Sequence, residues 1–145
     1  VAVRVKNPAG QVTDHLLSVD PVTVEVEYQL DADITGLRIG IYLMTSRGEY
    51  IFTSFDTDDP EAFQALGTRK AGRYISRCTI PSDTFNEGRF VIGINASSYM
   101  VKRFFGDERA MNFSINTTGA PGMHWVEIRH GPIRPRLDWR IEEIA

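Results

Sequence analysis

The chain of 145 residues has the length of one domain, and 42% hydrophobic with 24% charged residues is typical of a protein that buries a core. A formal net charge of -3 excludes the general basic surface on which nucleic-acid binding depends. A single cysteine, Cys78, excludes an intrachain disulfide and is compatible with a reducing compartment. No apolar run approaches the roughly 20 residues of a membrane-spanning helix. Because strand-like alternation begins at Val1, we expect residues 1–145 to form one domain of a longer protein.

Alternating apolar and polar residues predict a series of short strands separated by turn residues. In chain order the predicted strands are an edge strand at 1–6, then 22–30, 37–45, 50–55, 74–80, 90–96, 99–105 and 111–115. One short helix is predicted at 60–66, with Asp59 as N-cap, Pro60 at the first helical position and Gly67 at the C-cap. This spacing predicts an all-β fold, an antiparallel β-sandwich of two packed sheets.

Two sets of side chains could ligate a metal ion. Asp56, Asp58 and Asp59 could hold a hard cation such as calcium, but carboxylates just ahead of a helix are typical of capping and of a solvated loop. A second set consists of His124, Glu127 and His130. If these residues form a strand, the two histidines share one face and the glutamate points away. We therefore predict no metal site.

No catalytic or cofactor-binding motif is apparent, so we expect a binding domain that is not an enzyme and holds no cofactor. Cys78 lacks a histidine at a recognisable spacing and is predicted to be a small buried strand residue. Glu25 and Glu27 share a strand face, as is usual at a solvated edge rather than in a pair of catalytic carboxylates. N-glycosylation patterns at Asn95, Asn112 and Asn116 leave an extracellular location open.

One projected sheet face combines polar, aromatic and glycine residues. Outward-facing positions hold Arg38, Gly40 and Tyr42 on one strand, and Asn95 on another. A strand glycine often marks the close approach of a ligand, and an aromatic ring beside amide and guanidinium groups suits a sugar. The candidate carbohydrate-binding residues are Arg38, Tyr42, Arg77, Asn95, Asn112 and Ser114.

Four stretches carry a resemblance to a known family. They are the closing Gly131-Pro132-Ile133-Arg134-Pro135-Arg136-Leu137-Asp138-Trp139; Gly36 to Tyr42 with Arg47-Gly48 and Tyr50 to Ser54; Cys78-Thr79-Ile80-Pro81 through Gly88-Arg89-Phe90; and Asp107 to Phe113. Together they cover most of residues 35–139, and they match in spacing and turn residues. The chain resembles the C-terminal domain of Wzt-type ATPase subunits of O-antigen polysaccharide ABC transporters.

The resemblance implies an immunoglobulin-like sandwich that recognises the non-reducing, often capped, end of an O-antigen polysaccharide and couples chain completion to export. It also implies a cytoplasmic location at the inner-membrane face, with an ATPase domain and a transmembrane subunit as partners. A homodimer formed by exchange of the C-terminal strand is a further implication, with Arg134, Leu137 and Trp139 in the exchanged segment.

A different class of function stays open, in which the sandwich is a structural or protein-interaction module without a glycan site. The segment 119–136, with Trp125 and Ile128 among prolines and glycines, could pack on a partner chain.

Overall fold

Strands make up most of the ordered elements of this computed structural model, which describes residues 1–98 and 101–145. In chain order the elements are β1 (Ala2–Lys6), β2 (His15–Leu17), β3 (Val22–Leu30), β4 (Ile34–Thr35), β5 (Leu37–Thr45), β6 (Tyr50–Phe55), the 3-10 helix η1 (Asp56–Asp58), α1 (Pro60–Ala65), β7 (Thr68–Arg69), β8 (Gly72–Ile80), β9 (Gly88–Ser98) and β10 (Lys102–Asn116). The predicted bounds of β3, β5 and β6 are confirmed.

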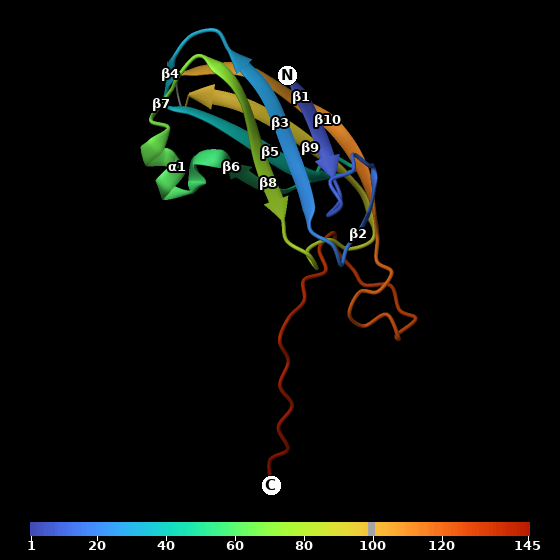
Figure 1. Cartoon of the computed structure of the whole chain (residues 1–145). Helices are drawn as coiled ribbons and strands as arrows, with labels where there is room; N and C mark the ends of the chain where they lie inside the picture. Colours follow the sequence, from blue (N-terminus) through green and yellow to red (C-terminus); the bar gives the residue numbers. More distant parts are fainter. Residues whose placement is uncertain (99–100) are drawn as a thin grey trace.

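Two sheets face each other across the core. One is three-stranded with the order β1-β3-β8, and the other is five-stranded with the order β2-β10-β9-β5-β6. A third, two-stranded sheet pairs β4 with β7. Neighbouring strands run antiparallel, apart from the short β2, which is parallel to β10. Figure 1 shows β3 and β8 lying over the strands of the larger sheet. The predicted antiparallel β-sandwich is confirmed.

Alternation along the strands produces the core between the sheets. On β3, the valines at 22, 24 and 26 are at most 1% exposed, and they face the buried Leu37, Ile39, Ile41 and Leu43 of β5. Burying one such side chain stabilises the fold by about 1.5–3 kcal/mol. At one end of the core the rings of Phe85, Phe90 and Phe113 contact one another, with centroids 4.9–5.7 Å apart.

Three sequence predictions about local structure are corrected, and three short strands are added. The strands predicted at 99–105 and 111–115 form one strand, β10, with an irregularity between Asp107 and Met111; Tyr99 and Met100 of the first prediction lie outside the described residues. Glu25 is not at a solvated edge, because β3 is the central strand of its sheet. The strand considered for 124–130 is absent, and those residues form turns and irregular chain. The strands β2, β4 and β7 were not predicted, since two or three residues show no alternation.

The helix begins where capping chemistry predicts. Asp59 is the N-cap and accepts a hydrogen bond from the backbone N–H of Glu61, with Pro60 in the first turn. The helix ends one residue earlier than predicted, at Ala65, and its C-cap is Leu66 rather than Gly67. Figure 1 shows α1 at the side of the sandwich where β6 and β7 lie. No helix in the described part of the chain is long and apolar enough to cross a membrane.

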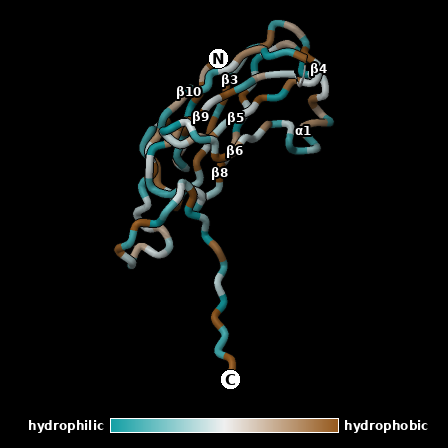
Figure 2. The backbone as a smooth tube through the Cα atoms, turned by 180° about the vertical axis from the view of Figure 1, so that it is seen from behind, coloured by the Kyte–Doolittle hydropathy of each residue, from teal (hydrophilic) through white to brown (hydrophobic). Residues whose placement is uncertain are grey.

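After β10 the chain is anchored to the loop between β8 and β9 and then leaves the sandwich. The amide of Asn86 donates to the carbonyl oxygens of Arg129 and Gly131, each at 2.8 Å, and the backbone N–H of Arg134 donates to the carbonyl of Thr84. Beyond this anchor residues 135–145, which we call the tail, extend away from both sheets (Figure 1). Hydrophobic and hydrophilic residues alternate along the tail (Figure 2).

Candidate functional site

Three of the predicted site residues lie together on the outer face of the five-stranded sheet. In the β5–β9 ladder Arg38 pairs with Ser97, Gly40 pairs with Asn95, and Tyr42 pairs with Gly93. Residues two apart on a strand share a face, so Arg38 and Tyr42 flank the position of Asn95. The inward-facing residues of the same strands form the core. The outward orientation predicted for these side chains is therefore correct.

Phe55 joins this face, although the sequence did not single it out. The β5–β6 register pairs Phe55 with Gly40. The ring occupies space that a side chain at position 40 would need, since a Cβ added to Gly40 would lie 2.5 Å from ring carbon Cε1. The guanidinium carbon of Arg38 is 3.8 Å from the centroid of the Phe55 ring. A cation over an aromatic face contributes about 0.5–1 kcal/mol at an exposed site. The alternation of residues 50–55 was the only sequence signal for Phe55. It could not show on which face of the sheet the ring lies, because that depends on the register of the β5–β6 hairpin.

A second aromatic pair extends the face. The rings of Tyr42 and Tyr50 meet edge to face, with centroids 5.8 Å apart, and Tyr50 is 65% exposed. Aromatic rings next to amide and guanidinium donors can pack on the apolar face of a sugar while its hydroxyls are hydrogen-bonded. We call the outer surface formed by Arg38, Tyr42, Tyr50, Phe55 and Asn95 the aromatic face.

Asn112 and Ser114 lie on the same side of the sheet but farther along it. Asn112 pairs with Val91 of β9, which in turn pairs with Met44, and Ser114 pairs with Arg89. Asn112 lines a small pocket of about 210 Å³ together with two arginines. Ser114 lines a separate hollow beside β2. The structure thus brings Asn112 and Ser114 to the predicted side without adding them to the aromatic face.

Arg77 is not brought together with the other predicted residues. It lies on β8 in the three-stranded sheet, where its Nε donates to Oε2 of Glu25 at 2.8 Å. Lys6 approaches the same carboxylate to 3.0 Å. Hydrogen bonds from Arg77 and Lys6 lower the pKa of Glu25 below its ordinary value, against the opposing effect of burial. The ion pair between Arg77 and Glu25 therefore stabilises the three-stranded sheet, on the opposite side of the sandwich from the aromatic face.

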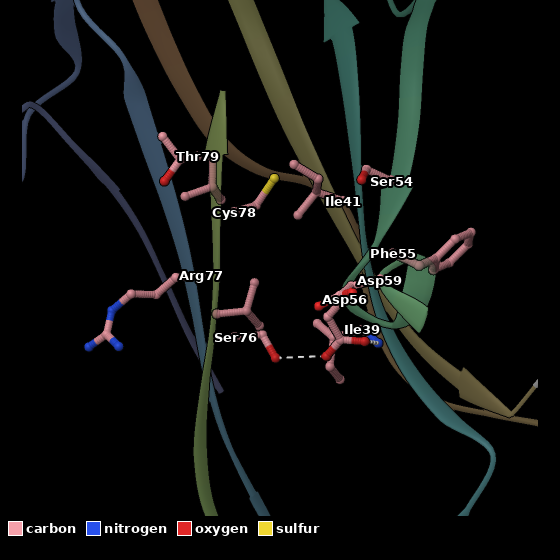
Figure 3. A pocket seen from close by; sticks show the side chains of 12 residues that line it. Ile39, Ile41, Ser54, Phe55, Asp56, Asp59, Ser76, Arg77, Cys78 and Thr79 are labelled. Carbon is pink, nitrogen blue, oxygen red and sulfur yellow. Dashed lines mark hydrogen bonds between the residues drawn. The ribbon is translucent and has the colours of Figure 1, made fainter. Parts of the chain in front are cut away.

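A groove of about 280 Å³ lies between the edge strands β6 and β8 (Figure 3). Core side chains form much of its lining: Val24, Val26, Ile39 and Ile41. The sulfur of Cys78 points into it, and burial raises the pKa of that thiol, which disfavours the reactive thiolate. The side chains of Arg77 and Phe55 point away from the groove (Figure 3).

Two carboxylates line this groove, Asp56 and Asp59, and the fold engages both; Asp59 is the N-cap of α1. Asp56 accepts hydrogen bonds from the hydroxyl of Ser76 at 2.9 Å, from the guanidinium of Arg69 at 3.0 Å and from the backbone N–H of Ile39 at 3.0 Å. Figure 3 shows the Ser76 bond closing the lower end of the groove. Because these contacts satisfy Asp56, the aromatic face is the better candidate for ligand binding.

The residues considered as metal ligands have other roles or stay apart. Asp58 accepts a hydrogen bond from the backbone N–H of Phe55, and Asp59 caps α1. His124 and His130 lie in the exposed segment after β10. Within residues 1–98 and 101–145, no group of three or more His, Cys, Asp or Glu side chains could hold a metal ion.

Comparisons with known proteins agree with this architecture. Residues 1–126 match the family described as the Wzt C-terminal domain. The structure described as "Crystal structure of the C-terminal domain of wzt" superposes with a TM-score of 0.72 at 10% identity, covering 97% of this chain and 81% of that chain. No curated protein matches the chain. Since the family match covers most of the chain, the chain belongs to the family of Wzt C-terminal domains.

Proposed function

We propose that this chain is a non-catalytic carbohydrate-binding domain that recognises the capped non-reducing end of an O-antigen polysaccharide. Recognition couples completion of the glycan to its export by an ABC transporter. The domain then acts in the cytoplasm at the inner-membrane face, as the C-terminal part of an ATP-binding subunit that works with a transmembrane subunit. Membership of the Wzt C-terminal domain family supports a carbohydrate-binding module in a transporter.

The observation that carries this proposal is the packing of Arg38 and Phe55 over Gly40. Because Gly40 has no side chain, the Phe55 ring can lie close to the strand there, and the guanidinium of Arg38 lies 3.8 Å from the ring centroid. Tyr42 and Asn95 flank this pair. Beside this pair the exposed ring of Tyr50 offers a sugar a packing surface, and Arg38 and Asn95 offer hydrogen-bonding groups, without requiring the sheet to rearrange.

A binding role rather than a catalytic one is supported by the state of the carboxylates. Glu25, considered for catalysis, is 4% exposed and is held by Arg77 and Lys6. Asp56 is held by Arg69 and Ser76. Glycoside hydrolysis needs two carboxylates that face each other across a substrate groove, and both of these are committed to the fold.

The test is a titration of the isotope-labelled domain, followed by backbone amide shifts. One polymer is O-polysaccharide with its native non-reducing terminus, and the control is the same polymer trimmed at that end. We expect only the intact polymer to shift amides around Tyr42, Phe55 and Asn95. Equal shifts with both polymers would remove the end-group specificity, and no shift at millimolar concentration would remove the glycan function altogether.

A second candidate function, a protein-interaction module, is favoured by the tail. Leu137, Trp139 and Ile141 alternate along it and are 64%, 84% and 99% exposed. Arg134 holds the base of the tail, since its side chain donates to the carbonyl of Pro121 at 2.8 Å. We propose that the tail forms a homodimer by strand exchange, a role compatible with glycan binding on the aromatic face.

A further inference from the structure

A small pocket beside the aromatic face has no assigned role. Its volume is about 210 Å³, and its lining residues are Ser46, Arg89, Phe90, Val91, Arg109 and Asn112. Typical sites for small molecules span about 300–1,000 Å³. A pocket of this size therefore fits one substituent or one sugar residue rather than a stretch of polysaccharide.

The irregularity in β10 carries one arginine to this pocket. The register is shifted between Asp107 and Met111, and the backbone N–H of Arg109 donates to the carboxylate of Asp107 at 3.0 Å. The guanidinium of Arg109 donates to the carbonyl of Ser46 at 3.4 Å, in the turn between β5 and β6. Gly93 allows the bulge to lie close to β9, because a Cβ added to Gly93 would be only 2.8 Å from the carbonyl oxygen of Glu108.

The second arginine, Arg89, comes from the start of β9. Within the described residues, neither its guanidinium nor that of Arg109 is ion-paired with a carboxylate. The arginines on the three-stranded sheet differ, since Arg73 and Arg77 each pair with a glutamate. Two neighbouring guanidinium groups without an ion pair in the described part of the chain favour an anion, and the planar guanidinium fork matches a carboxylate or a phosphate.

The pocket adjoins the tyrosines of the aromatic face. Tyr50 pairs with Met44, and Met44 pairs across β5 and β9 with Val91, which lines the pocket. Tyr42 lies two residues before Met44 on the same face. Neighbouring residue pairs on one face of the sheet therefore connect the two tyrosines to the pocket.

We propose that this pocket binds an anionic substituent of the saccharide, a carboxylate or a phosphate, and so selects acidic glycans. Arg89 and Arg109 bind the oxyanion, and the side-chain amide of Asn112 donates a further hydrogen bond. This inference rests on the proposed function for the identity of the attached sugar, but the anion site can be measured by itself.

The experiment titrates the labelled domain with inorganic phosphate, with glucuronate and with neutral glucose, and observes the side-chain amide of Asn112 and the arginine Nε–H groups. We expect phosphate or glucuronate, but not glucose, to shift these signals, and the anion that acts identifies the class of substituent. The Arg89→Gln/Arg109→Gln variant should weaken anion binding roughly tenfold or more. Arg73→Gln, on the other sheet, is the matched control and should leave binding unchanged.

The outcomes separate this inference from the proposed function. If neither anion shifts the pocket signals, or if Arg73→Gln weakens binding as much as the double variant, the anion site is wrong. The glycan function still stands in that case if intact polysaccharide shifts Tyr42 and Asn95. If the anions bind at the pocket but no polysaccharide shifts the aromatic face, the anion site stands and the proposed function fails.

Discussion

The guanidinium of Arg38 lies over the ring of Phe55, with its central carbon 3.8 Å from the ring centroid. The two residues come from neighbouring strands, and Gly40 provides the space that the ring occupies. This contact fixes the orientation of a half-buried aromatic ring and of the guanidinium on it, which reduces the conformational entropy that a ligand would have to remove on binding.

Phe55→Leu is expected to weaken polysaccharide binding by about tenfold, because it removes the ring that holds the Arg38 guanidinium in position on the aromatic face. Isothermal titration calorimetry would measure the affinity. Phe63→Leu is the control, since Phe63 is a surface phenylalanine, 63% exposed, on α1 rather than on the five-stranded sheet. Equal losses in the two variants would show that the effect is not local to the ring at position 55.

Gly40→Ala should reduce binding while leaving the fold nearly intact. The new methyl group meets the Phe55 ring at 2.5 Å, and the ring can swing aside because it is a side chain. Gly93→Ala should behave differently, because its methyl group meets the backbone carbonyl of Glu108 at 2.8 Å. We expect a loss of about 1–3 kcal/mol of unfolding free energy for Gly93→Ala and less than about 1 kcal/mol for Gly40→Ala, measured by urea denaturation. The reverse order would contradict this packing.

Glu25→Gln should destabilise the protein by about 1–3 kcal/mol at neutral pH, because Lys6 and Arg77 lose their shared carboxylate. The pKa of Glu25 is lowered in the folded state, so the unfolded state binds the proton more tightly. The stabilisation by Glu25 is therefore complete above the unfolded-state pKa of about 4.3 and is lost as the pH falls through the folded-state pKa.

Urea denaturation at a series of pH values checks the Glu25 prediction. The difference between wild type and Glu25→Gln should shrink below about pH 4.3. A difference that stays constant down to the acid limit would mean that the charge of Glu25 contributes nothing.

Arg69→Met should cost about 3–5 kcal/mol, because it removes a buried cation and leaves the Asp56 carboxylate without its charged partner. Arg69 is 1% exposed and donates to the hydroxyl of Tyr28 at 2.6 Å and to Asp56 at 3.0 Å. Burial lowers the pKa of Arg69, but the charges and hydrogen bonds of Asp56 and Tyr28 together raise it by more, so the side chain stays charged. Thermal unfolding measures the loss, with Arg73→Met as the exposed control. A loss no larger than that of the control would rule out this internal role.

Leu137→Ser/Trp139→Ser should convert a dimer of the wild-type chain into a monomer, because the two residues provide apolar surface that is exposed in a single chain. Sedimentation velocity over a range of concentrations measures the oligomeric state. Val12→Ser, at another exposed apolar position, should leave the dimer intact. A monomeric wild-type chain, or a variant that stays dimeric, would contradict the exchange.

The amino-acid sequence by itself determined the local elements of this protein. Period-two alternation over nine residues specified the bounds of β3 and β5, and the Asp59-Pro60 pair specified the start of α1, because side-chain alternation and helix capping depend on neighbours along the chain. It also predicted which side of its sheet Tyr42 occupies. The family resemblance found in the sequence is confirmed by the family match.

Only the tertiary structure decided which strands share a sheet, and hence which side chains meet. Alternation could not assign Arg77 to the sheet opposite Arg38, or place Phe55 over Gly40. Nor could it show that the bulge in β10 carries Arg109 to the turn at Ser46. Strand order and register depend on pairings between residues far apart in sequence, and a local pattern contains no information about the partner.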